Sequence, residues 1–202
     1  MPDHYYTQTP TSAHKPGQVD FLWRGAKLVF ETDSGVFSRT EIDKGTEILL
    51  NALPEELTGS LLDMGCGYGV IGVTLGKRYP GLSVVMSDVN ERAVELSRRN
   101  AQRNGVPARV MQSDGYADVP FQRMDWIVQN PPIRAGKSVI YAMFAEGARR
   151  LEPSGELWLV IRKQQGAESA AAYLKTLFGQ VEAVTKKGGY WVLRCAQPVE
   201  NA

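Results

Sequence analysis

Short apolar segments alternate with amphipathic segments along the chain, after a polar, proline-containing lead. The apolar segments are rich in branched and aromatic residues and are bounded by turn-forming residues, which is typical of strands. They predict strands at 26–32, 59–65, 82–89, 108–114, 124–130, 156–163, 180–187 and 190–196. The segments between them have apolar residues at helical spacing. They predict helices at 43–53, 70–79, 90–105, 138–151 and 167–179, with Asp43 and Asn90 as amino-terminal caps.

This alternation favours the doubly wound α/β class, a mostly parallel sheet with helices on both faces. Only a short Gly188-Gly189 turn separates the last two strands, so they must form an antiparallel hairpin. We therefore expect a Rossmann-like, mostly parallel, seven-stranded sheet that ends in this hairpin. We assign this domain to residues 43–202 and a small extension to residues 1–42, in which 26–32 pairs with 35–39 as a β-hairpin.

The composition excludes several function classes. The 202 residues carry a net charge of +1 and 43% hydrophobic residues, which are ordinary globular values. With two histidines and two cysteines, the chain lacks the residues for a histidine-based metal site, a catalytic triad or a disulfide framework. No apolar run approaches the roughly 18 residues of a membrane span, and the first residues do not read as a signal peptide. We expect a cytoplasmic protein that uses neither a membrane nor a metal.

A glycine-rich turn follows the strand at 59–65. It reads "DMGCGYG", with one acid and three glycines at Asp63, Gly65, Gly67 and Gly69. Glycines at such a turn permit close approach of a ligand to the backbone. A dinucleotide fingerprint would place its third glycine where this chain has Val70. An acid at the start of a loop that lacks a pyrophosphate cradle favours a cationic ligand instead.

Two further acids end the next two strands. Asp88 follows the glycines at a distance where a carboxylate binds ribose hydroxyls, and Asp114-Gly115 lies within reach of an adenine amino group. Ligands of open α/β sheets bind at the carboxyl edge of the strands, so the three acids together predict a nucleoside site. Taken singly, each also fits a structural role in a turn or at a helix start.

The stretch "QNPPIRAGK" (129–137) ends the strand at 124–130. Proline has no backbone N–H, so Pro131 and Pro132 terminate the strand. Asn130 and the carbonyl of Pro131 then form a fixed pair of hydrogen-bond acceptors at the strand end. A purely structural alternative is that Asn130 caps the turn before Pro131.

These motifs resemble those of the class I S-adenosylmethionine (SAM)-dependent methyltransferases. "DMGCGYG" is similar to their first motif, and Asp88 and Asp114 to their adenosine-binding acids. "NPPI" resembles their Asn-Pro-Pro motif, the signature of enzymes that methylate nitrogen on planar, conjugated amines. Together with "HYYTQTP" and "GVFSRTEIDKGTEILL", it most resembles the RsmC-like guanine-N2 methyltransferases of small-subunit ribosomal RNA.

The resemblance implies SAM as the cofactor and the N2 amine of a guanine in RNA as the substrate, with ribosomal RNA or the small ribosomal subunit as the partner. It implies that Asn130 and Pro131 are catalytic. It implies cofactor contacts from Gly45, Thr46, Asp63, Gly65, Gly67, Gly69, Asp88, Val89, Asp114, Gly115 and Asn130. It implies substrate contacts from Phe37, Pro132, Ile133, Arg134 and Lys137.

One departure from the family pattern and two sets of basic residues bear on RNA binding. Many Asn-Pro-Pro enzymes have an aromatic residue where this chain has Ile133, so stacking on the base falls to Phe37 or Tyr141. Arg134 and Lys137 flank the motif and suit phosphate contacts. A separate set of basic residues on one helix is interpreted as a solvated face: Arg92, Arg99 and Arg103.

Three alternatives remain at this point. The chain is a methyltransferase of protein glutamine or of adenine in nucleic acid, a non-catalytic RNA-binding module with the same fold, or a nicotinamide-dependent oxidoreductase. The intact motifs disfavour the second alternative, and Val70 disfavours the third.

Overall fold

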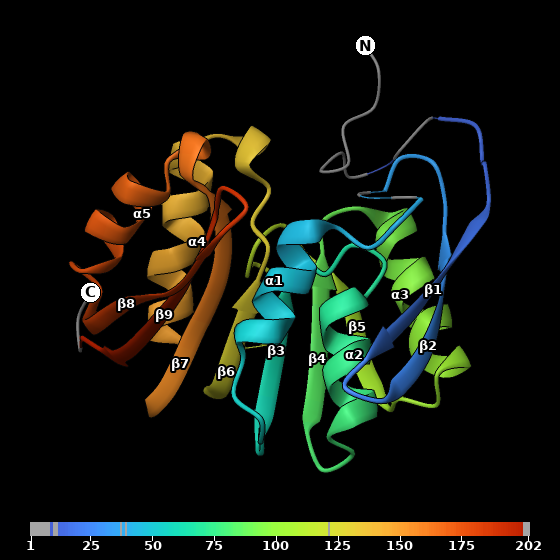
Figure 1. The fold of residues 1–202 in the computed structure, drawn as a ribbon, viewed down its shortest axis with the longest axis horizontal. Helices are drawn as coiled ribbons and strands as arrows, with labels where there is room; N and C mark the ends of the chain where they lie inside the picture. The colour runs from blue at the N-terminus through green and yellow to red at the C-terminus, as the bar shows by residue number, and fades with distance from the viewer. Residues whose placement is uncertain (1–8, 10–11, 37, 39, 121, 200–202) are drawn as a thin grey trace.

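A twisted seven-stranded sheet forms the centre of the computed structural model, which describes residues 9, 12–36, 38, 40–120 and 122–199 (Figure 1). The strand order is β5-β4-β3-β6-β7-β9-β8. The parallel strands are β3 (Ser60–Met64), β4 (Ser83–Asp88), β5 (Ala108–Gln112), β6 (Met124–Gln129) and β7 (Leu151–Arg162). The last two, β8 (Phe178–Lys187) and β9 (Tyr190–Pro198), form an antiparallel pair. The predicted fold class and the predicted hairpin at Gly188-Gly189 are confirmed.

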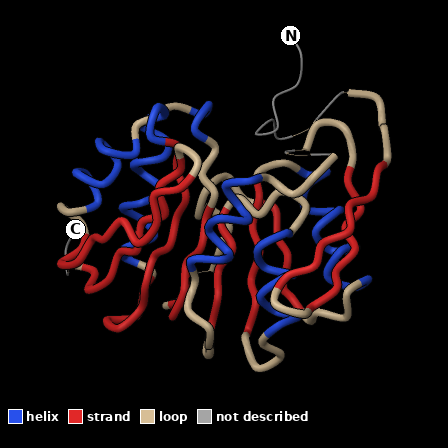
Figure 2. The backbone as a smooth tube through the Cα atoms, viewed as in Figure 1, coloured by secondary structure: helices blue, strands red, loops and turns tan. Residues whose placement is uncertain are grey.

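Helices cover both faces of this sheet (Figure 2). They are α1 (Lys44–Ala52), α2 (Val70–Arg78), α3 (Glu91–Arg103), α4 (Lys137–Arg149) and α5 (Ala167–Leu174). Neighbouring residues of a strand face opposite sides, so Leu61 joins an apolar cluster with α1, α2 and α3, while Leu62 joins a second cluster with α4 and α5. None of the helices in the described ranges is long and apolar enough to cross a membrane.

The predicted helix caps are confirmed, and several element boundaries differ from prediction. The Asp43 side chain accepts a hydrogen bond from Thr46 N–H, and the Asn90 side chain accepts one from Ala93 N–H. Strand β7 begins at Leu151 rather than 156, because its pairing with β6 shifts register over these residues. Helix α5 ends at Leu174, and β8 already begins at Phe178.

The predicted hairpin exists, but its predicted pairing is wrong. Strand β2 (Ala26–Thr32) pairs with β1 (Gly17–Trp23), which precedes it, and not with 35–39. The reason is the turn at Arg24-Gly25, where both residues have positive φ, 45° and 82°. Two such residues form the turn that matches the twist of paired strands.

Two asparagine side chains of α3 complete the free edge of β2. The Asn100 amide accepts from Glu31 N–H at 2.7 Å and donates to Glu31 C=O at 2.9 Å. The Asn104 amide makes the same two hydrogen bonds to Val29. Because Val29 and Glu31 are two residues apart on one strand edge, residues one helical turn apart on α3 reach both. The hairpin is thereby fixed to the main sheet's helical layer.

The interpretation of the α3 arginines as a solvated face is wrong for Arg92, whereas Arg99 and Arg103 are exposed. Arg92 is largely buried and donates to the Ser34 carbonyl at 2.8 Å. Arg99 and Arg103 both form ion pairs with Glu31, at 3.4 and 2.9 Å. These side chains join α3 to the amino-terminal extension.

A buried carboxylate holds the turn between β3 and α2. Gly69, at the start of α2, has no side chain to cap the helix. Asp63 on β3 takes over this role, because its carboxylate accepts a hydrogen bond from Gly72 N–H at 2.8 Å. Asp63 is fully buried, and its other oxygen has no partner among the described residues. Burial, with a smaller contribution from the nearby charge of Asp88, raises the pKa of Asp63 to about 7, against the lowering effect of the Gly72 bond.

The first prediction concerns the attachment of the hairpin. Asn100→Ala leaves the Glu31 N–H and two carbonyls unpaired, and each buried unpaired polar group costs about 1–3 kcal/mol. We expect the free energy of unfolding to fall by about 2–4 kcal/mol in urea denaturation. The matched control is Gln102→Ala, an exposed position on the same helix, which we expect to change it by less than about 0.5 kcal/mol. Equal midpoints for the parent and Asn100→Ala would contradict this assignment.

The second prediction concerns Asp63 and pH. Between about pH 4 and pH 7 the folded protein retains a proton on Asp63 that the unfolded chain has released. The contribution of Asp63 to stability is therefore largest at low pH and is lost as the pH rises through this window. Asp63→Asn keeps an acceptor for Gly72 N–H but does not titrate. We expect the variant to gain about 2–3 kcal/mol relative to the parent between pH 5 and pH 8. Urea unfolding of both proteins at both pH values measures this, and a constant difference would disprove it.

Candidate active site

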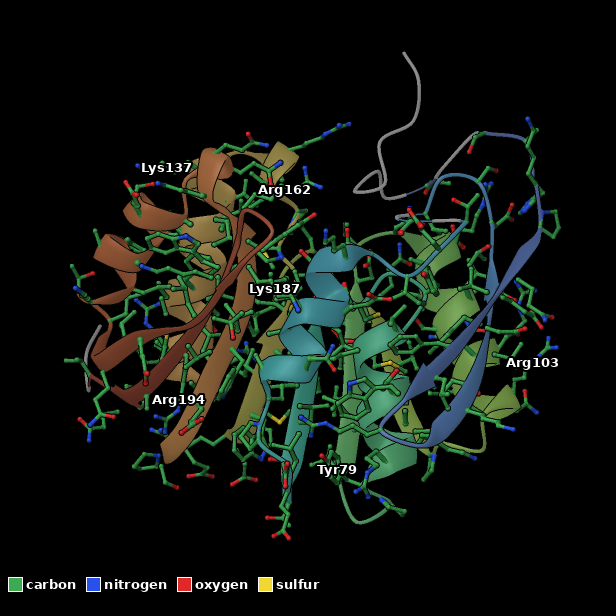
Figure 3. All side chains as sticks on the ribbon, viewed as in Figure 1. Tyr79, Arg103, Lys137, Arg162, Lys187 and Arg194 are labelled. Carbon is green, nitrogen blue, oxygen red and sulfur yellow. The ribbon has the colours of Figure 1, made fainter. Side chains whose placement is uncertain are left out.

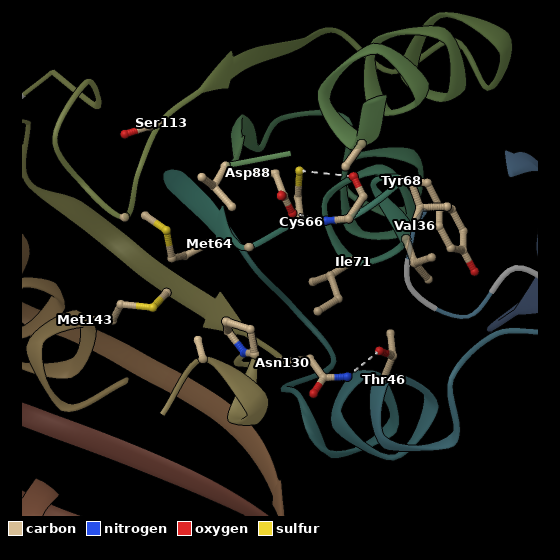
Figure 4. Close-up of a pocket in the computed structure, with 18 of the residues that line it drawn as sticks. Val36, Thr46, Met64, Cys66, Tyr68, Ile71, Asp88, Ser113, Asn130 and Met143 are labelled. Atoms are coloured by element: carbon tan, nitrogen blue, oxygen red, sulfur yellow. Dashed lines mark hydrogen bonds between the residues drawn. The ribbon is translucent and has the colours of Figure 1, made fainter. Parts of the chain in front are cut away.

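A cavity of about 450 Å³ opens at the carboxyl edge of β3, β4 and β6 (Figure 4). It brings together nine of the residues predicted from the sequence: Thr46, Gly65, Gly67, Asp88, Val89, Asp114, Gly115, Asn130 and Pro132. Three separate motifs of the chain therefore converge on one enclosed space, as the rule for open α/β sheets requires.

The glycine turn forms one wall of the cavity. Gly65 and Gly67 have positive φ, and a Cβ atom on either would point into open space. The N–H groups of Gly65 and Cys66 donate to the Ser87 carbonyl at 2.8 and 3.0 Å, which fixes the turn against β4. Gly69 differs, since a Cβ there would contact Ser97, and it does not line the cavity. The turn thus leaves room for a ligand against its backbone at its first two glycines.

Asp88 links this turn to the next strand. Its carboxylate accepts hydrogen bonds from Gly67 N–H at 2.8 Å and from Asn90 N–H at 2.9 Å. Burial raises the pKa of Asp88 to about 6, although these two hydrogen bonds oppose the rise. The two oxygens of a carboxylate together offer about four lone-pair sites, so Asp88 retains acceptor capacity for a ligand that donates. Asp88 therefore both shapes the glycine turn and presents an acceptor to the cavity.

The third strand end adds Asp114 and Gly115. Asp114 is exposed at the rim, and Gly115 has a positive φ of 54° with open space where a Cβ would lie. Beneath them, Ser113 is buried and its hydroxyl accepts from Asp118 N–H, which holds the loop in place. This side of the cavity combines an exposed carboxylate with a flat backbone surface.

The amide of Asn130 is held in one orientation. Its nitrogen donates to the Asp43 carboxylate and to the Thr46 hydroxyl, both at 3.0 Å; Figure 4 shows the bond to Thr46. A carboxylate only accepts hydrogen bonds, so the amide nitrogen must face Asp43 and the amide oxygen must point away from it. No described residue donates to this oxygen, and Asn130 lines the cavity. The Pro131 carbonyl likewise receives no hydrogen bond from the described residues.

Several predicted site residues lie outside the cavity lining. Gly45 packs against the ring of Tyr190, and Asp63 lies buried beneath α2. The lining also lacks four residues of the segment that contains the short 3-10 helix η1 (Ile133–Ala135), although their neighbours Pro132 and Ala135 belong to it: Pro131, Ile133, Arg134 and Lys137. Tyr141, a candidate for stacking on a base, instead stacks on Tyr173 with ring centroids 4.1 Å apart. Phe37 lies outside the described residues.

Sequence reasoning missed two groups of lining residues. The first group, Val36, Ser38 and Tyr68, comes from the loop after β2 and from the glycine turn, and the Tyr68 hydroxyl donates to the Ser38 carbonyl at 3.2 Å. The second group is apolar and comes from η1 and α4: Ala135, Val139 and Met143. Val139 and Met143 are one helical turn apart, so their spacing in the sequence indicates that they lie on one face of a helix. This spacing could have identified the second group.

α3 anchors the loop that carries Val36. The Asn90 amide donates to the Gly35 carbonyl at 2.9 Å, and the Arg92 guanidinium donates to the Ser34 carbonyl at 2.8 Å. Asn90 lies two residues after Asp88, so the same segment positions both an acid of the cavity and the loop beside it. Hydrogen bonds from the start of α3 therefore hold the loop that forms this wall of the cavity.

A family model and two relatives match the chain. The model of the methyltransferase small domain matches residues 27–194. The uncharacterized protein YbxB of Bacillus subtilis is 44% identical over 197 residues, which cover 96% of this chain and 98% of that protein. The ribosomal RNA small subunit methyltransferase C of Hahella chejuensis is 42% identical over 170 residues, covering 78% of this chain and 49% of that enzyme.

A solved structure matches as well. The 16S rRNA N2 G1207 methyltransferase RsmC of T. thermophilus, in complex with AdoMet and guanosine, superposes with a TM-score of 0.80. It is 28% identical, and the match covers 92% of this chain and 51% of that enzyme. The chain thus spans about half the length of both RsmC enzymes. It belongs to the methyltransferase small domain family, as an RsmC-like member of the class I methyltransferases, which use S-adenosylmethionine.

Proposed function

We propose that this protein transfers a methyl group from SAM to the N2 amine of a guanine in RNA, and that the RNA is small-subunit ribosomal RNA. The observation that carries the proposal is the orientation of Asn130, which lines the cavity and whose amide oxygen, like the carbonyl of the adjacent Pro131, accepts no hydrogen bond from the described residues. Two acceptors side by side suit a group with two N–H bonds, which an exocyclic amine has.

The cavity walls fit SAM at its three parts. The turn at Gly65 and Gly67 would hold the methionine part, and the Asp88 carboxylate would accept from the ribose hydroxyls. Val89 would pack on the adenine, and Asp114 beside Gly115 would accept from its amino group. SAM, when bound, supplies a methyl group on a positively charged sulfur, which the carboxylates around the cavity favour. Thr46 would border the cofactor from α1, and Asp63 would act on it only through the α2 turn.

Asn130 and Pro131 would activate the amine. The lone pair of an exocyclic guanine nitrogen is delocalised into the ring, so the nitrogen is a poor nucleophile. Hydrogen bonds from its two N–H groups to Asn130 Oδ1 and to the Pro131 carbonyl would favour a pyramidal nitrogen with a localised lone pair. The nitrogen would take the methyl group as the sulfur–methyl bond breaks and leaves its electron pair on sulfur, and the nitrogen, then positive, would release one proton to water. Most of the acceleration would come from fixed dipoles and alignment, because Asp43 and Thr46 hold the Asn130 amide in advance.

The relatives and the surface support an RNA substrate. Both RsmC enzymes carry ribosomal RNA in their names, and the T. thermophilus structure contains guanosine. Ala135, Val139 and Met143 would contact the target base where related enzymes use an aromatic residue, with Pro132 and Ile133 beside them. Arg134 and Lys137 are exposed on this side and would contact phosphates.

The third prediction concerns the substrate, and the same assay then tests Asn130. Labelled methyl transfer from SAM is measured to total RNA, small ribosomal subunits, DNA and protein in parallel, and the product is digested to nucleosides. We expect label in RNA, as N2-methylguanosine. Label in methyladenine or in glutamine would overturn the proposal in favour of another N-methyltransferase, and no transfer to any of them would favour a binding module.

In the same assay, Asn130→Ala removes the proposed acceptor. We expect normal folding and normal SAM affinity, with single-turnover transfer slowed by about a hundredfold to a thousandfold, as for the loss of one preorganised group at a reacting atom. Alanine is preferred to aspartate, because Asn130→Asp would set a second carboxylate against Asp43. Near-parental turnover in folded Asn130→Ala protein would contradict the mechanism.

A further inference from the structure

A second hollow adjoins the active-site cavity. It is a groove of about 860 Å³ lined by Lys44, Arg162, Lys163 and Tyr190, among others, and we refer to it as the basic groove. Ser38 and Asp43 line both the groove and the cavity. The groove therefore leads directly from the mouth of the cavity, on the side where α1 begins.

The sheet topology explains why basic residues meet here. β7 runs parallel to β6, so Arg162 at its end lies at the same edge as Asn130. β9 is antiparallel to β7, so the β8–β9 turn comes to that edge as well. Lys187 pairs with Tyr190, and Tyr190 pairs with Arg162, which places the three side chains in one row across the sheet. Figure 3 shows Arg162 and Lys187 near the amino end of α1.

The Arg162 guanidinium is held in a fixed position. Its Nε donates to the Tyr190 hydroxyl at 2.8 Å, and its Cζ lies 4.8 Å from the centroid of the Tyr190 ring. Tyr190 is itself buried, because its ring packs against the Cα of Gly45, where a Cβ would come within 2.8 Å. The side chain of Arg162 is exposed, and its terminal nitrogens have no partner among the described residues. Such a group is a preorganised fork for an anion.

The charges around the groove leave several cations without acidic partners. Lys44 extends over the Gly188 turn, and neither it nor Lys187 forms an ion pair with a described residue. Among the acids, Asp43 accepts from Thr46 N–H and Asn130, and Glu168 lies 3.7 Å from Lys163. Glu41 is the remaining carboxylate of the lining. The lining thus has as many carboxylates as basic residues, but Arg162 and Lys44 form no ion pair with a described residue, so these two groups are available to an anionic ligand.

We propose that the basic groove binds backbone phosphates of the RNA next to the target nucleotide, with Arg162 as the main phosphate contact. The inference rests on the proposed function, since it extends the substrate path from the cavity. A strand whose base enters the cavity must pass its mouth, and Ser38 and Asp43 join that mouth to the groove. Arg162, Lys44 and Lys187 then provide sequence-independent positioning contacts.

The test is RNA binding by Arg162→Ala at several salt concentrations, measured by fluorescence anisotropy with a single-stranded fragment of small-subunit ribosomal RNA. We expect affinity to fall about tenfold near 0.1 M salt, with a log–log salt slope flatter by about 0.7. SAM affinity should not change. Arg162→Lys keeps the charge but loses the fork, so it should restore the salt slope and recover only part of the affinity.

The matched control is Arg109→Ala, an exposed arginine near the start of β5, on the opposite edge strand of the sheet. We expect it to bind RNA as the parent does. Equal losses in Arg109→Ala and Arg162→Ala, or an unchanged salt slope in Arg162→Ala, would overturn the groove assignment. So would a loss confined to assembled subunits, since that result would indicate an acidic protein partner. In all three cases the proposed function would still stand if the parent protein methylates RNA. If the parent does not methylate RNA, the proposed function itself is refuted.

Discussion

The hydrogen bond from the Asn130 amide to the Asp43 carboxylate decides which end of the Asn130 side chain is left free for a ligand. An asparagine side chain has a donor end and an acceptor end of nearly the same shape, so its position alone does not define its chemistry. A carboxylate accepts hydrogen bonds and cannot donate them, and this constraint turns the nitrogen of Asn130 toward Asp43 and leaves the oxygen as the free end. Thr46, which accepts the second amide hydrogen, leaves the nitrogen no free donor.

The same contact ties the catalytic edge to the rest of the sheet. Asp43 also caps α1, so the start of this helix and the end of β6 are fixed to each other. The absence of a side chain at Gly45 lets Tyr190 pack against α1, and Tyr190 in turn holds Arg162. A continuous set of packed and hydrogen-bonded residues thus runs from Asn130 to the basic groove. In this set of residues Gly45 has a packing role against Tyr190, in addition to the cofactor contact that the family resemblance implies.

The sequence was informative where a function depends on a local pattern. Three local patterns each predict a particular backbone geometry: the glycine turn, the acids at strand ends and the Asn-Pro-Pro stretch. Asp88 and Asn130, which these patterns single out, do line one cavity. It was uninformative where side chains act across the fold. Asn100 hydrogen-bonds a strand edge that lies far from it in sequence, and nothing local to α3 indicates this. Tyr141 looked available for a base because its stacking partner, Tyr173, belongs to another helix. The pairing of β2 was missed because the Arg24-Gly25 turn was not recognised.

The most direct test of this account is a double-mutant cycle between Asp43 and Asn130, measured by single-turnover methyl transfer at saturating SAM and RNA. Asp43→Ser is the suitable change, since serine also caps a helix but can donate as well as accept, and so does not orient the amide. The account predicts that Asp43→Ser slows transfer about tenfold in the parent and has no further effect in Asn130→Ala protein. Equal slowing by Asp43→Ser in both backgrounds would show that Asp43 acts independently of Asn130, and would contradict the account.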